Sequence, residues 1–167
     1  MSDLNSDIVS TYGNRLRIRV CGFYIENQKL LLVKHKSLAA HGYFWAPPGG
    51  GMEYGETSSQ TLVREFKEEV GLHITQFHFA FTHEFIDPPL QAIELYYIVS
   101  AAEGEVKKGI DPEMHIDSQL IQEVCFMSLA EIKALPQHNK HHVLNAIESL
   151  EELTTRNSYS IYNPQGI

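Results

Sequence analysis

The sequence is poor in cysteine, in basic residues and in long hydrophobic runs, and each shortage excludes a class of protein. Its two cysteines, Cys21 and Cys125, do not form a metal-binding motif, so a reduced, cytoplasmic chain is the simplest interpretation, although the two thiols could pair. No apolar run approaches the roughly 18 residues that span a bilayer. The opening segment, MSDLNSDIVS, lacks the basic flank and apolar stretch of a signal peptide. We therefore expect no membrane partner.

Positive charge is also scarce, with 13 basic residues against 21 acidic ones and a net charge of −8. A protein that binds a nucleic acid polymer needs clustered Lys and Arg, so we expect no such partner. An acidic protein still binds an anionic ligand when divalent cations bridge the two. The composition, 43% hydrophobic and 20% charged, is typical of a globular domain.

The hydrophobic pattern predicts several strands around two or three helices. We expect a tail over residues 1–13, a single domain over residues 14–153 and a second tail, or a partner-pairing segment, over residues 154–167. Strands are predicted at 15–24, 29–34, 74–85 (one or two strands), 93–101 and 121–127, and helices at 58–70, from 128 to near 136 and at 141–153. This order favours an α/β/α sandwich with a mixed β-sheet.

Between the second strand and the first helix lies a glycine-rich loop, WAPPGGGMEYGE, over residues 45–56. Its prolines and glycines exclude a helix and favour an irregular loop. Gly49, Gly50 and Gly51 let the backbone approach a ligand closely. Carbonyl groups there can bind a metal ion, and amide groups can face phosphate oxygens.

The helix that follows gathers three carboxylates. Thr57 or Ser58 can cap its start and Gly71 its end. At about 100° per residue, Glu65, Glu68 and Glu69 fall within roughly 100° of arc. A solvated surface is the ordinary interpretation of such a cluster. Beside a glycine loop, however, oxygen ligands that repel one another favour a bound Mg²⁺ or Mn²⁺.

The spacing of this region resembles a known signature. Gly50 is followed after five residues by Glu56, after seven more by Arg64-Glu65-Phe66, and then by Glu68-Glu69 and Gly71-Leu72. This is similar to the box of the Nudix hydrolases, GX5EX7REUXEEXGU, where U is a bulky apolar residue, and every defined position matches. The order of strands and helices on both sides also fits that family's sandwich.

The resemblance implies a role for each residue of the box. Glu65, Glu68 and Glu69 would bind divalent metals, with the carbonyl of Gly49 as a further ligand. Arg64 and Glu56 would pair and support the carboxylates. The general base would be Glu65 or a carboxylate on a distal loop, for which Glu113 is the candidate against its interpretation as a solvated loop residue.

Other residues carry weaker signals. The candidate phosphate-binding residues are Gly50 and Gly51 in the loop and Lys34 and Arg19 on strands. The side chains of Lys34 and Arg19 are equally explained as surface charges. Of the nine histidines, His138, His141 and His142 are interpreted as a solvated cluster, and His78 and His83 as the exposed side of a strand. Four aromatic residues that could stack on a base are more simply core residues: Tyr24, Tyr43, Phe44 and Tyr96.

Together these features predict a magnesium-dependent hydrolase that cuts a phosphoanhydride bond in a nucleoside-diphosphate-type molecule, such as a nucleoside triphosphate or an ADP-sugar. Pro88, sixteen residues after Leu72, resembles a marker of family members that cleave ADP-ribose, but a turn explains it equally well. The alternatives are a non-catalytic nucleotide sensor and a protein-interaction domain. Exposed strand edges and the C-terminal tail make a homodimer plausible.

Overall fold

A computed structural model describes residues 9–10, 12–36, 42–110, 120–156 and 159–163 of the chain. Its elements in chain order are β1 (Arg15–Glu26), β2 (Lys29–Lys36), β3 (Tyr43–Ala46), β4 (Gly49–Gly51), α2 (Ser58–Val70), β5 (His73–Asp87), β6 (Leu90–Glu103), β7 (Ile121–Met127), α3 (Leu129–Ala134), the 3₁₀ helices η2 (Gln137–Asn139) and η3 (His142–Leu144), α4 (Glu151–Thr155) and β8 (Ser160–Tyr162). None of the described helices is long and apolar enough to cross a membrane.

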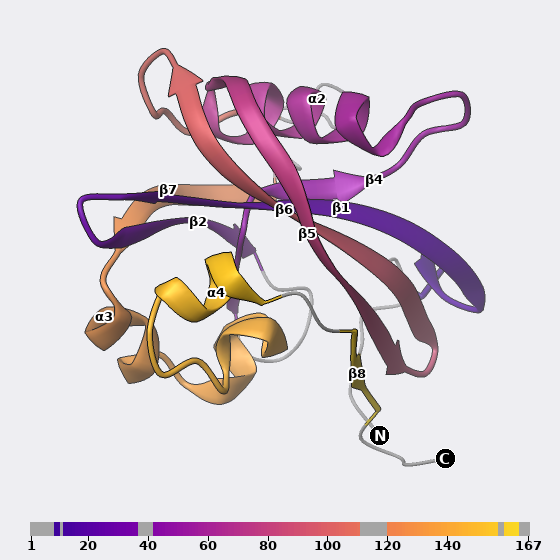
Figure 1. Ribbon diagram of the computed structural model, residues 1–167. Coiled ribbons are helices and arrows are strands. Elements are labelled where there is room, and N and C mark those ends of the chain that lie inside the picture. The colour runs from indigo at the N-terminus through magenta and orange to yellow at the C-terminus, as the bar shows by residue number, and fades with distance from the viewer. Residues whose placement is uncertain (1–8, 11, 37–41, 111–119, 157–158, 164–167) are drawn as a thin grey trace.

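The strands form one mixed sheet with helices on two sides. Its order is β3-β2-β1-β6-β5-β8, with β4 added to β1 and β7 added to β2. The β1–β6 and β5–β8 pairs are parallel, and the others are antiparallel. Helix α2 lies on one side of the sheet and α3 and α4 on the other (Figure 1). The predicted mixed sandwich is confirmed.

Strand β2 shows why the sheet is covered on both sides. Leu31 and Val33 belong to the core beneath α2, whereas Leu30 and Leu32 belong to the core that faces α3 and η3. All four side chains are fully buried. Because successive side chains of a strand point to opposite faces, this unbroken apolar run requires a layer of structure on each face.

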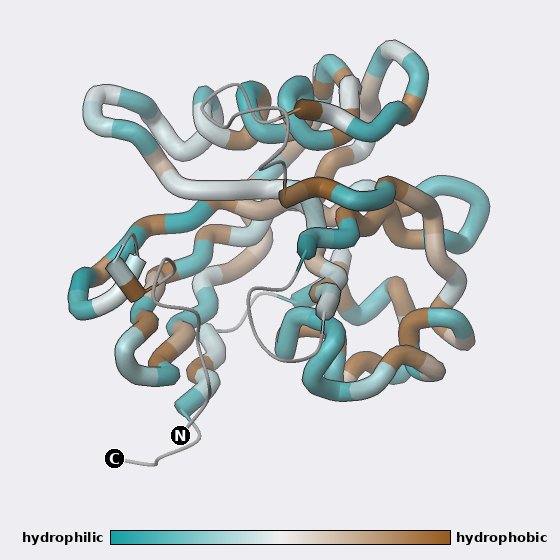
Figure 2. The backbone as a smooth tube through the Cα atoms, turned by 180° about the vertical axis from the view of Figure 1, so that it is seen from behind, coloured by the Kyte–Doolittle hydropathy of each residue, from teal (hydrophilic) through white to brown (hydrophobic). Residues whose placement is uncertain are grey.

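Helix α2 begins and ends where its local sequence directs. The Thr57 side chain accepts a hydrogen bond from the backbone N–H of Gln60, whose side chain returns to Thr57 in a capping box. At the other end, Gly71 adopts a left-handed conformation with φ of 73°. Leu62, Phe66 and Val70 form the buried stripe. Hydrophobic and hydrophilic residues accordingly alternate along α2 (Figure 2).

Two predictions of secondary structure are wrong. Residues 141–153 do not form one helix: η3 ends at Leu144 and α4 begins only at Glu151, and between them the backbone N–H of Glu148 donates to the Glu152 carboxylate at 3.1 Å instead of to a helical carbonyl. The apolar residues of that segment are nevertheless buried, including Val143 and Ile147. The loop predicted over 45–56 is also partly ordered as strand, since its glycines form β4 and pair with β1.

The C-terminal segment has an intramolecular partner. Strand β8 lies parallel to β5, with His83 opposite Ser160 and Phe85 opposite Tyr162. The described part of the segment predicted as a tail, or a partner-pairing segment, therefore extends the sheet of its own chain along residues 83–85 of β5.

Candidate active site

The glycine turn reaches the site because β4 pairs with β1 at close range. Gly49 has a φ of 150°, and a Cβ there would lie 2.2 Å from the carbonyl oxygen of Val20. A Cβ on Gly50 would lie 2.3 Å from Oε1 of Glu65. Glycine at position 49 thus allows the positive φ and the close contact with β1. Glycine at position 50 leaves room for the Glu65 carboxylate.

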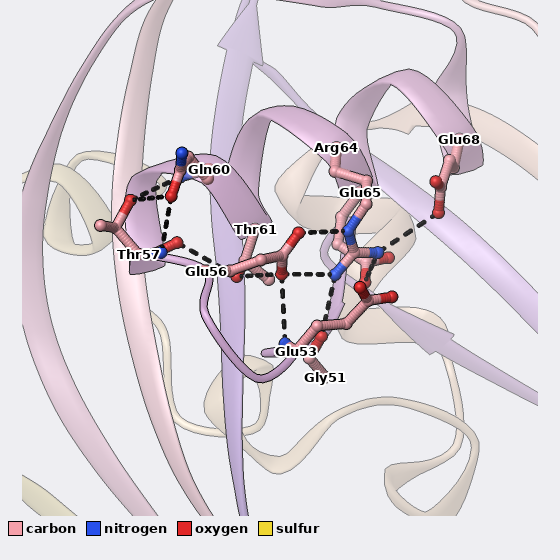
Figure 3. Close-up of polar contacts among 9 residues, drawn as sticks. All are labelled: Gly51, Glu53, Glu56, Thr57, Gln60, Thr61, Arg64, Glu65 and Glu68. Carbon is pink, nitrogen blue, oxygen red and sulfur yellow. Dashed lines mark hydrogen bonds and ion pairs between the residues drawn. The ribbon is translucent and has the colours of Figure 1, made fainter.

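Arg64 lies at the centre of the acidic residues (Figure 3). Its Nε donates to Oε1 of Glu56 at 2.8 Å, and its Nη1 donates to Glu65 at 2.9 Å and to Glu68 at 3.3 Å. Its Nη2 donates to the carbonyl of Gly51 at 3.0 Å. One guanidinium therefore ties the loop to three carboxylates and offsets their mutual repulsion.

Glu56 is held as an ionised partner of this guanidinium. It also accepts hydrogen bonds from the hydroxyl of Thr61 at 2.8 Å and from the backbone N–H of Glu53 at 3.1 Å. The hydrogen bonds from Arg64, with those from Thr61 and the backbone, lower the pKa of Glu56 to about 2. The contact expected between Glu56 and Arg64 is present in the structure.

The three carboxylates of α2 sit at different depths. The side chains of Glu65 and Glu69 are 11% and 12% exposed, while that of Glu68 is 30% exposed. The backbone N–H of Gly49 donates to Oε2 of Glu69 at 2.8 Å, so this carboxylate faces the glycine turn. Burial raises the pKa of Glu65, against the opposing effect of Arg64. The turn, two inward carboxylates and one outer carboxylate together form an oxygen-rich site.

Of the two basic residues predicted to bind phosphate, Arg19 lies at this site. Its Nη2 donates to the carbonyl of Gly49 at 3.3 Å, and its Nη1 lies 3.7 Å from Oε1 of Glu94. Lys34 instead lies 3.4 Å from Glu123 and over the ring of Tyr43. Glu94 was not predicted from the sequence, because it is almost completely buried in β6 and its strand gives no local signal of a functional residue.

The interpretation of the histidines as solvated is wrong for three of them. His83 and His141 are 5% and 4% exposed, and the His142 side chain is 12% exposed. Nε2 of His141 lies 3.2 Å from Oε1 of Glu94. Burial lowers the pKa of His83 and brings that of His142 to about 2, so both rings are neutral near pH 7. Contacts between distant segments, invisible to strand periodicity, bury these rings.

Other candidates resolve simply. Tyr96 is fully buried and stacks on Phe23 and Phe81, so it is a core residue. Both cysteines are free thiols. Glu113, the candidate distal base, lies outside the described residues.

A cavity of about 970 Å³ opens between α2 and residues 107–110. Its lining includes Arg64, Lys67 and Glu68, but neither Glu65 nor Glu69. It therefore lies beside the oxygen-rich site rather than over the glycine turn.

Comparison with known proteins decides the family. The family model of the NUDIX domain matches residues 15–146, which include the glycine turn, all of α2 and most of the sheet. The chain belongs to the Nudix family.

Solved structures agree on the fold. A MutT Nudix hydrolase from Burkholderia pseudomallei superposes with a TM-score of 0.65 at 22% identity, covering 81% of this chain and 98% of that one. A MutT protein from Bacillus halodurans gives 0.60 at 21% identity, covering 89% and 91%.

Named relatives of this Nudix chain carry several activities. An ADP-ribose pyrophosphatase of Methanocaldococcus jannaschii is 35% identical over 96 residues, which are 56% of each protein. An 8-oxo-dGTP diphosphatase of Proteus vulgaris is 36% identical over 93 residues, covering 53% of this chain and 81% of the relative. The chain thus matches little more than half of the Methanocaldococcus protein.

Proposed function

We propose that this Nudix protein hydrolyses a phosphoanhydride bond in a nucleoside diphosphate linked to a further group, with Mg²⁺ or Mn²⁺ as cofactor. The observation that carries this proposal is that Glu65 and Glu69 contact the glycine turn, while Arg64 joins Glu68 to Glu65. Two of these carboxylates, those of Glu65 and Glu69, are buried. A cluster that served only as a solvated surface would leave all three in solvent.

The residues present fit a hard divalent cation. The donors are carboxylate oxygens of Glu65, Glu68 and Glu69 and the carbonyl of Gly49, and all of them are oxygen ligands of the kind that Mg²⁺ prefers. Gly50 leaves space beside the Glu65 carboxylate that any side chain would fill. When bound, the cation would polarise the phosphoryl oxygens and lower the pKa of the attacking water.

The protein's own groups would orient the substrate and move the proton. Arg64 fixes the carboxylates through its bonds to Glu65 and Glu68. Arg19 places a positive charge beside Gly49, where it can face a phosphate oxygen. Glu65, whose pKa is raised by burial, is suited to accept a proton from water. Glu113 is the alternative base.

The substrate class follows from the relatives rather than from the site. ADP-ribose and 8-oxo-dGTP, after which two relatives are named, both contain a nucleoside diphosphate with a further group attached. Both are therefore the first compounds to test. A homodimer, a cytoplasmic location, the lack of a nucleic acid polymer partner and the single domain over residues 14–153 stay predictions.

The test is turnover of a panel that contains ADP-ribose, 8-oxo-dGTP and unmodified nucleoside triphosphates, with and without Mg²⁺. We expect metal-dependent release of a nucleoside monophosphate, and a severe loss of kcat in Glu68→Gln and Glu69→Gln with the fold intact. Glu103→Gln, an exposed change at the end of β6, is the matched control. Nucleotide binding without turnover in the wild type would instead identify a sensor, and wild-type turnover in both α2 variants would refute the ligand assignment.

A further inference from the structure

A second group of metal-binding side chains lies away from the α2 carboxylates. His83 on β5, Glu94 on β6 and His142 on η3 each offer a ligand atom, and these atoms lie within 4.8 Å of one another. Glu94 and His83 are adjacent because they are paired across the β5–β6 ladder. His142 is brought to them by the break in the predicted C-terminal helix. Imidazole and carboxylate groups together are typical ligands of divalent transition metals.

The rings are already oriented for ligation. The Nε2 atoms of His83 and His142 face each other at 2.5 Å, and Nε2 of His142 lies 3.9 Å from Oε2 of Glu94. Nδ1 of His83 lies 2.6 Å from the hydroxyl of Ser160. A proton on Nδ1, donated to that hydroxyl, leaves the Nε2 lone pair directed at the group, as in the outer hydrogen bonds of known metal sites.

Neighbouring residues fix the other two ligands. The His142 ring stacks between Phe85 and Tyr162, with centroid distances of 5.0 and 4.6 Å. The carboxylate of Glu94 accepts hydrogen bonds from Tyr96 at 3.2 Å and from His141 at 3.2 Å. These two donors surround a carboxylate that is 1% exposed to solvent. Burying a charge this deeply is costly unless opposite charges or donors surround it.

We propose that His83, Glu94 and His142 bind a divalent transition metal ion of the Zn²⁺ type, at a site separate from the α2 carboxylates. The competing explanation is a proton shared between the two rings. A shared proton accounts only for the approach of the two nitrogens, whereas a cation accounts for the gathering of both nitrogens and the Glu94 carboxylate within 4.8 Å. Zn–N bonds of about 2.0–2.1 Å in tetrahedral geometry require the two nitrogens to lie about 3.3 Å apart. The rings therefore need to separate by less than about 1 Å.

The bound ion would join the C-terminal part of the chain to the sheet. His142 lies on η3, and β8 supplies Ser160 and Tyr162, so one ion would tie both segments to the β5–β6 hairpin. Three protein ligands leave a coordination position open. Glu94 also contacts Arg19, which in turn contacts Gly49, so the ion would help to fix an arginine of the proposed active site.

The test uses Co²⁺ as a spectroscopic probe of the chelator-treated full chain, with excess Mg²⁺ present to occupy the oxygen site. We expect one equivalent of Co²⁺ to give the intense visible bands of a four- or five-coordinate ion with nitrogen ligands. His83→Asn and His142→Asn should lose these bands. His78→Asn, an exposed change on the same strand, should keep them.

Three results would overturn the proposal. The first is a wild-type spectrum no more intense than that of Co²⁺ in buffer. The second is retention of the bands in both His83→Asn and His142→Asn. The third is their loss in Glu69→Gln alone, which would assign the ion to α2. Circular dichroism checks that each variant is folded. If one variant is not folded, the wild-type spectrum still tests the proposal through the first of these results.

Discussion

Replacing Gly50 by alanine should damage the active site while leaving the fold almost unchanged. The added Cβ would lie 2.3 Å from Oε1, 2.6 Å from Cδ and 2.7 Å from Oε2 of Glu65. Because ordinary contacts begin near 3.4 Å, the carboxylate must move by about 1 Å. A misplacement of that size at a reacting centre costs about 100-fold in rate, which corresponds to nearly 3 kcal/mol of transition-state stabilisation.

The clash involves the far end of a flexible side chain, and Gly50 does not need a positive φ. We therefore expect the free energy of unfolding to change by less than about 1 kcal/mol. The assay is kcat/KM for the best substrate of the panel at saturating Mg²⁺, with urea unfolding measured on the same samples. Gly51→Ala is the matched comparison, since its Cβ would meet nothing within 4 Å, and its loss of activity should be far smaller. Equal activity in the two variants would refute the proposed role of the Glu65 position.

Three further results are expected. Arg64→Lys should lower kcat/KM by about 10- to 100-fold, because one ammonium cannot replace the contacts of the guanidinium with Glu56, Glu65 and Glu68; an unchanged rate would show that these contacts do not position the carboxylates. The hydrogen bonds from Arg64 lower the pKa of Glu56 from 4.5 to about 2, so its stabilising effect is complete above pH 4.5 and is lost as the pH falls towards 2. Urea unfolding of the wild type should therefore lose stability over this range more steeply than Glu56→Gln, and parallel curves would contradict the assignment. Phe66→Ala, which empties a fully buried position, should cost about 3–5 kcal/mol in the same unfolding assay, whereas a cost below 1 kcal/mol would mean that this core is not packed as described.

Short-range signals account for the parts of the structure that the sequence predicted well. The hairpin between β1 and β2 turns at Asn27 and Gln28, which both adopt positive φ. Helix α2 starts at the Thr57 cap and stops at Gly71. In each case the residues that decide the structure are neighbours in the chain. The box that carries the candidate active site is likewise one continuous stretch, so its residues could be named before the fold was known.

The histidine–glutamate group depends instead on contacts between residues far apart in the chain. His83 and Glu94 meet only because β5 and β6 pair in one register, and a shift of one residue would turn either side chain to the opposite face. His142 joins them because η3, rather than the long helix that periodicity predicts, places its ring beside His83. Local sequence therefore determined the helix, its caps and the acidic box of this protein, because each rests on spacing along one segment. Only the tertiary structure decided which buried side chains meet, because that depends on strand register and on backbone hydrogen bonds between distant segments.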